Sequence, residues 1–151
     1  MIDGLVVKKI TAHQDVSGFF AELTKDGEDS YRDMKQVSYS ETYPGVIKAF
    51  HLHKAYWESW AVVKGMAEVV IYDCREDSKT KGETQVFVTG EKNMMFITIP
   101  PGVAHGYRAL GNQAVGVIYC AGKAYDPKNP GIENIPHDDS TINYNWSRGN
   151  G

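Results

Sequence analysis

Residues 45–65 read GVIKAFHLHKAYWESWAVVKG and place two histidines, His51 and His53, on either side of one leucine, with Glu58 five residues beyond the second. Side chains two apart in a β-strand project to the same face, so a strand here would present both imidazoles together. A turn after HKAYW would bring the carboxylate alongside them on the next strand. These residues alone indicate either a metal site or a base that acts on a substrate.

The composition is that of one ordinary globular domain spanning residues 1–151, because 151 residues with 42% hydrophobic content can bury a core. The net charge of -3 and the lack of a Lys/Arg run exclude nucleic acid or an anionic membrane as an expected partner. No apolar run approaches membrane-spanning length, and the N-terminus lacks the features of a secretory signal. We therefore expect a cytoplasmic protein, with Cys74 and Cys120 as free thiols.

Strand-length runs rich in Val, Ile, Phe and Tyr recur along the chain between Gly, Pro, Asp or Asn. They are GLVVKKI, GFFAEL, MKQVSYSE, GVIKAFHLH, ESWAVV, AEVVIYDC, TQVFVTG, MMFITIP, HGYRAL and AVGVIYCA. Their number and spacing predict an all-β barrel or sandwich. A short helix is expected at 26–34, and an extended surface arm at 123–151 with an edge strand at 142–146 and a frayed end at 147–151.

A third histidine, His105, follows a Pro-Gly turn in PPGVAHG. Three imidazoles and a carboxylate form a ligand set that a divalent zinc, manganese, iron or nickel ion accepts. The spacings resemble the two motifs of the cupin superfamily, single-domain jelly-roll barrels (double-stranded β-helices) with a metal site inside. The resemblance implies a cupin fold with one ion held by His51, His53, Glu58 and His105.

A wider resemblance, from residue 10 to residue 146, is to the dTDP-4-dehydrorhamnose 3,5-epimerase branch of the cupins. DVSGFFAE resembles the family's D-x-R-G-x-F-x-E, and QVSYSETYPGVIKAFH resembles Q-D-N-x-S-x-S-x-x-G-V-L-R-G-L-H. IPPGVAHGYRAL is nearly identical to the corresponding segment of the family. IYCAGKAYDP resembles L-Y-K-x-T-x-Y-Y-x-P, and HDDSTINYNW resembles D-D-P-x-I-x-I-x-W.

The resemblance implies that His51 removes a proton beside a sugar ketone, that Tyr119 reprotonates the opposite face and that Lys48 stabilises the enolate oxygen. It also implies a set of substrate-binding residues, namely Gln36, Tyr125, Phe20 and Glu22. This chemistry is reasonable in itself, because a proton next to a carbonyl is acidic enough for imidazole when the enolate is stabilised.

Three positions depart from the family: its first-segment arginine is Ser17, its asparagine after the glutamine is Ser38, and its lysine is Glu58. A strict epimerase needs no metal, whereas a histidine bound to an ion has used the lone pair that a base requires. If His51 is a ligand, the ion would polarise the ketone as a Lewis acid.

Three functions follow in order of preference. The first is an epimerase or isomerase that acts on a 4-keto, nucleotide-linked sugar by enolisation. The second is a metal-dependent cupin with another small-molecule substrate, and the third is a non-catalytic cupin. The resemblance also implies a homodimer in which residues 1–25 form N-terminal strands that reach the partner's site.

Overall fold

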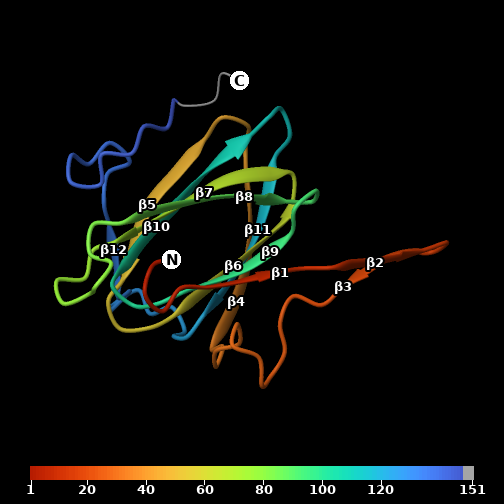
Figure 1. Ribbon diagram of the computed structural model, residues 1–151, viewed down its shortest axis with the longest axis horizontal. Helices are drawn as coiled ribbons and strands as arrows, with labels where there is room; N and C mark the ends of the chain where they lie inside the picture. Colours follow the sequence, from red (N-terminus) through yellow and green to blue (C-terminus); the bar gives the residue numbers. More distant parts are fainter. Residues whose placement is uncertain (148–151) are drawn as a thin grey trace.

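Two antiparallel five-stranded sheets form the computed structural model, which describes residues 1–147 (Figure 1). One sheet has the order β1 (Val6–Lys9), β9 (Met95–Ile99), β6 (Glu58–Lys64), β11 (Val115–Ala121) and β4 (Gln36–Thr42). The other has the order β12 (Ile132–Asn134), β5 (Ile47–His53), β10 (Val103–Leu110), β7 (Met66–Asp73) and β8 (Thr84–Gly90). This is the predicted all-β jelly-roll barrel.

The core lies between the two sheets, where apolar side chains alternate inward along β6, β7, β9, β10 and β11. Trp60 of β6 and Tyr107 of β10 meet across the barrel edge to face, with ring centroids 5.5 Å apart at 87°. Such an aromatic pair contributes about 0.5–1.5 kcal/mol beyond the apolar area it buries. This contact connects the two sheets through β6 and β10, the strands that also carry Glu58 and His105.

Several local expectations differ from the structure. Residues 26–34 form turns instead of a helix, because they have no apolar face and their side chains bind elsewhere; Glu28, for example, pairs with Lys8 at 2.6 Å. The expected strand at 142–146 does not form. The cysteines are free thiols, as predicted. Residues 1–147 contain no helix that could span a membrane, and most of the predicted frayed end lies outside them.

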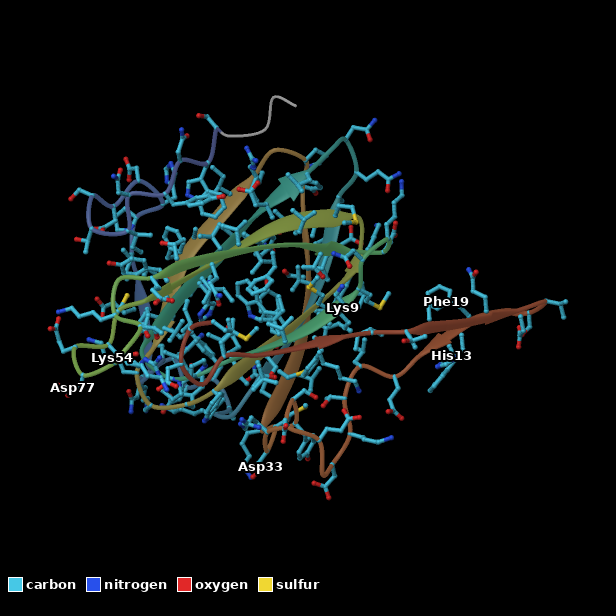
Figure 2. The ribbon with its side chains drawn as sticks, in the orientation of Figure 1. Lys9, His13, Phe19, Asp33, Lys54 and Asp77 are labelled. Atoms are coloured by element: carbon cyan, nitrogen blue, oxygen red, sulfur yellow. The ribbon has the colours of Figure 1, made fainter. Side chains whose placement is uncertain are left out.

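A hairpin of β2 (Ala12–Asp15) and β3 (Gly18–Ala21) projects away from the barrel (Figure 1). The labelled His13 and Phe19 lie on this projection (Figure 2). Phe19 and Phe20 are 61% and 67% exposed, although both are large and apolar. The hairpin therefore makes up a substantial part of the N-terminal segment and contributes little to the core of its own chain.

The C-terminal segment covers the outer edge of β5. Its strand β12 pairs with β5 and places Asn134 opposite His51. Trp146 packs against Phe50 with ring centroids 5.5 Å apart, and the Tyr144 hydroxyl donates a 2.7 Å hydrogen bond to Glu68. Instead of the expected strand at 142–146, this segment anchors aromatic side chains behind the strand that carries the paired histidines.

A bulge between β5 and β10 determines which side chains of β5 face inward. His51 lies opposite His105, but Lys48 lies opposite Tyr107, so three steps on β5 match two on β10. In a regular strand an odd spacing would turn Lys48 and His51 to opposite faces. The bulge brings both to the same side, where they line one pocket.

Gly106 makes this close approach possible, and its replacement by alanine is expected to destabilise the barrel. A Cβ at this position would lie 2.3 Å from the Ala49 Cβ and 2.9 Å from the Lys48 carbonyl oxygen, so backbone would have to move. We expect Gly106→Ala to lower the free energy of unfolding by about 1–3 kcal/mol, measured by urea denaturation. Ala49→Gly in the same chain should recover part of the loss, and unchanged stability in the single variant would contradict the contact.

Candidate functional site

A pocket of about 490 Å³ lies between the sheets and is bounded mainly by polar side chains. It is lined by Gln36, Ser38, Ser40, Lys48, His51, His53, Glu58, Tyr119, Ala121 and Ile132. Both predicted proton-transfer residues, His51 and Tyr119, are in this set, as are Lys48 and Gln36. The pocket therefore brings together residues from distant parts of the chain that can carry acid–base chemistry.

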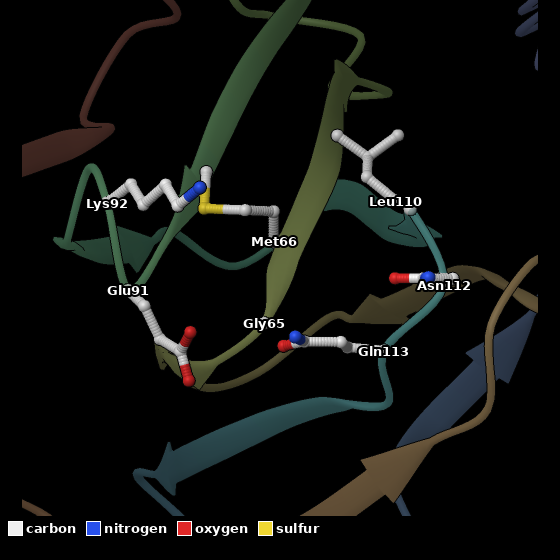
Figure 3. A pocket seen from close by; sticks show the side chains of 8 residues that line it. Gly65, Met66, Glu91, Lys92, Leu110, Asn112 and Gln113 are labelled. Carbon is white, nitrogen blue, oxygen red and sulfur yellow. The ribbon is translucent and has the colours of Figure 1, made fainter.

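A smaller hollow of about 230 Å³ lies at the opposite end of the same strands (Figure 3). Its walls include Gly65, which directly follows β6, and Leu110 at the end of β10. Glu91 and Lys92 are the charged residues in its lining, which has no histidine or tyrosine. We therefore assign the candidate site to the larger pocket.

The buried carboxylate of Glu58 is the centre of the site. Its Oε2 accepts hydrogen bonds from Trp60 Nε1 at 2.8 Å and from His105 Nε2 at 2.9 Å, and it lies 3.2 Å from His53 Nε2. Trp60 follows Glu58 by two residues on β6, so strand alternation places both side chains on the inner face. His53 comes from β5 and His105 from β10, so this single oxygen joins three strands.

Glu58 is ionised in this environment. Burial raises the pKa of its carboxyl, but the hydrogen bond from His105 and the nearby imidazole of His53 outweigh burial and hold the pKa well below its usual range. The His105 Nδ1 lies 3.0 Å from the Val103 carbonyl oxygen, which can only accept, so Nδ1 carries a proton. His105 Nε2 faces the ionised carboxylate, which also can only accept, so the donated proton makes His105 and Glu58 an ion pair.

His53 is buried, and neither of its ring nitrogens has a well-angled hydrogen-bond partner among the described residues. An unsatisfied buried polar group of this kind destabilises a fold by about 1–3 kcal/mol. Ligand atoms of His53, Glu58 and His105 lie within 4.8 Å of one another. The structure thus groups three of the four predicted metal ligands, and His51 lines the same pocket outside this group.

His51 occupies the position from which a base could reach a substrate in the pocket. Burial lowers the pKa of its imidazole from 6.5, and the neighbouring His105 lowers it further. The side chain is therefore neutral at neutral pH, with a lone pair available. This is the protonation state that proton abstraction requires.

Tyr119 reaches the pocket from β11, in the opposite sheet. Burial raises the pKa of its phenol, against the opposing effect of the hydrogen bond from Ser40. The hydroxyl stays protonated, as an acid must before it donates. His51 and Tyr119 thus have the opposite protonation states that a base and an acid need.

The four predicted substrate-binding residues are placed differently. Gln36 lines the pocket, and its side-chain oxygen accepts a 2.8 Å hydrogen bond from the Tyr125 backbone nitrogen. The Tyr125 side chain is exposed beside it. Phe20 lies on the projecting hairpin and Glu22 just beyond it, and neither lines the pocket of its own chain.

Sequence reasoning missed four residues around the acid and the carboxylate: Ser40, Thr42, Trp60 and Tyr107. A signal for the first two exists, because Gln36, Ser38, Ser40 and Thr42 alternate at the spacing of one strand face, and all four are polar. Polar residues on the inner face of a strand indicate a pocket instead of packed core. Tyr107 also follows His105 by two residues on β10.

Comparison with known proteins gives consistent results along the whole chain. The sequence profile of the family described as dTDP-4-dehydrorhamnose 3,5-epimerase matches residues 1–150. The spore coat polysaccharide biosynthesis protein SpsL of Bacillus subtilis is 52% identical over 147 residues, which cover 97% of both chains. The probable low-salt glycan biosynthesis epimerase Agl13 of Haloferax volcanii is 37% identical over 148 residues, 97% of this chain and 95% of that protein.

A similar fold is found in the crystal structure of a dTDP sugar isomerase from Desulfovibrio desulfuricans G20. The two structures superpose with a TM-score of 0.90 at 24% sequence identity. The alignment covers 99% of this chain and 94% of the other. The predicted jelly-roll fold is therefore confirmed by a solved structure as well as by the strand topology.

Proposed function

The chain belongs to the dTDP-4-dehydrorhamnose 3,5-epimerase family, and we propose that it epimerises a 4-keto nucleotide sugar by enolisation in the pocket between its sheets. The observation that carries this proposal is the pair His51 and Tyr119, which line one pocket from opposite sheets. The names of two relatives, SpsL and Agl13, refer to polysaccharide and glycan biosynthesis, which supports a nucleotide-activated sugar as substrate.

In the proposed reaction His51 takes the proton from the carbon next to the ketone. The electron pair of that C–H bond moves onto the carbonyl oxygen and forms an enolate, which the Lys48 ammonium stabilises. Tyr119 then donates its hydroxyl proton to the same carbon from the other face, which inverts the centre. The His51 proton must afterwards return to the Tyr119 phenolate, directly or through solvent, to restore the resting enzyme.

Deuterium exchange tests the proposal. In deuterated water the wild-type protein should place solvent deuterium next to the ketone of a 4-keto nucleotide sugar and invert that centre. His51→Asn removes the base and should slow exchange by about 10²–10⁴-fold. Tyr119→Phe should keep exchange but lose inversion, because abstraction and return of the proton on one face need only His51. Mass spectrometry and proton NMR measure the two quantities.

His137→Asn is the matched control, since His137 is exposed and should leave both rates unchanged. The exchange rate should fall only when the pH drops through the pKa of His51, which burial places below 6.5. Below that pKa the imidazole is charged and cannot accept a proton. Absence of exchange with every member of a panel of 4-keto nucleotide sugars would exclude the proposed reaction.

A metal ion is a second element of the proposed site, supported by the unsatisfied ring nitrogens of His53. His53, Glu58 and His105 would hold one divalent ion, and two imidazoles with a carboxylate suit zinc, manganese, iron or nickel. When bound, such an ion supplies a Lewis acid that polarises a ketone. His51 lies outside the group, so it would keep its lone pair, and a metal site and a histidine base become compatible.

Elemental analysis of protein purified without added metal tests this site. We expect close to one divalent ion per chain in the wild type, and loss of the ion in His53→Ala and in His105→Ala. His51→Asn should retain the ion although it loses exchange. A wild-type protein with only background metal, or a His51→Asn variant that loses its ion, would argue against the three-residue assignment.

We also propose a homodimer in which the projecting hairpin packs against a second copy. Phe19 and Phe20 on the hairpin and Val37 and Tyr39 on the outer face of β4 are exposed apolar side chains. β4 is an edge strand, so its apolar outer face borders an unpaired edge. The projection would carry Phe20 and the nearby Glu22 toward the partner's pocket, where the predicted substrate contacts could form.

Sedimentation velocity tests the dimer. The wild type should sediment as a dimer, and Phe19→Ser with Phe20→Ser should give a folded monomer because the hairpin loses its apolar contact. Val86→Ser with Val88→Ser removes two exposed valines from the outer face of β8 and should leave the dimer intact. A monomeric wild type at micromolar concentration would contradict this assembly.

A further inference from the structure

Behind Tyr119 lies a chain of hydroxyl groups that the proposed reaction does not yet use. The Tyr119 hydroxyl is 3.0 Å from the Tyr107 hydroxyl, which is 2.6 Å from the Thr42 hydroxyl. Ser40 also donates a hydrogen bond to the Tyr119 oxygen at 3.2 Å. Each hydroxyl both donates and accepts, so the direction of the hydrogen bonds along this chain can reverse without movement of heavy atoms.

The hydroxyl chain ends inside the protein. Tyr107 is 1% exposed and Thr42 is 2% exposed, so the far end has no contact with solvent. Trp60 packs edge to face against both tyrosine rings, with centroids 5.5 Å from Tyr107 and 5.4 Å from Tyr119. The rings are therefore held in place, and the buried end can supply hydrogen bonds but no proton from outside.

We propose that Tyr107 is a positioning residue for the acid step, and that its hydroxyl, supported by Thr42, stabilises the phenolate that Tyr119 becomes after donating its proton. This inference rests on the proposed epimerase function. As the Tyr119 O–H bond breaks and the new C–H bond forms, negative charge remains on the phenolic oxygen. Tyr107 then donates to that oxygen, Thr42 donates to Tyr107, and Ser40 remains as the second donor.

Hydrogen bonds to a charged oxygen are about twice as strong as those between neutral groups, so this arrangement favours the state after proton transfer. The hydroxyl groups would act as an oxyanion hole does, except that the negative charge they stabilise is on Tyr119, the enzyme's own acid. A phenylalanine at position 107 would fill the same space in the core. The hydroxyl is what adds the hydrogen bond to Tyr119.

Tyr107→Phe tests the proposal by separating exchange from inversion. We expect inversion of the sugar centre to fall on the order of a hundredfold, the typical effect of removing one such donor. Deuterium exchange from the His51 side should change little, and KM should stay the same. Thr42→Val should shift the ratio of inversion to exchange in the same direction but less. A loss of packing alone would lower both rates together, and that result would overturn the proposal.

Tyr72→Phe is the matched control, because it removes a phenol hydroxyl from the barrel away from Tyr119 and should leave the ratio unchanged. A measurement without substrate separates this inference from the proposed function. Difluorotyrosine placed at position 119 titrates in an accessible range, and Tyr107→Phe should move that titration to higher pH. If the titration does not move, the inference fails even where the enzyme is active; if it moves in a protein without exchange activity, only the proposed reaction fails.

Discussion

A single buried carboxylate organises the interior of this barrel. Glu58 accepts hydrogen bonds from Trp60 and His105 and lies next to His53, so its charge holds groups from three strands in one place. The family resemblance places a lysine at this position, which would leave the indole and both imidazoles without an acceptor. Glu58 is therefore the acceptor on which the indole and both imidazoles converge.

The fold could be predicted from the sequence because apolar strand-length runs, bounded by turn residues, mark nearly all of the barrel strands. The failures have physical reasons. Residues 12–15, AHQD, have no apolar alternation and pair with β3 only as part of an exposed hairpin. Residues 142–146 were predicted to form a strand, but their aromatic side chains instead attach the segment to the barrel, with Trp146 packed against Phe50. The bulge at Lys48 depends on the contact with Gly106, which no local pattern reveals.

The site was predictable in part. The HxH spacing, the glutamate and His105 identify which side chains meet, but they cannot show that His51 lies outside the group formed by the other three. Tyr107 was missed, because its importance comes from a hydroxyl contact across the barrel that the local sequence does not show. Phe20 lies on the projecting hairpin and Glu22 just beyond it, so neither lines the pocket of its own chain.

The pairing of β12 with β5 has an evolutionary consequence. The backbone of the histidine that we assign as base is aligned with a short strand from the C-terminal segment, and its neighbour Phe50 rests on Trp146. Substitutions in this tail at positions other than Ile132 can therefore shift the imidazole slightly while every pocket residue stays the same. Paralogues that differ mainly after residue 130 could diverge in stereochemical outcome, and comparisons restricted to pocket residues would overlook the cause.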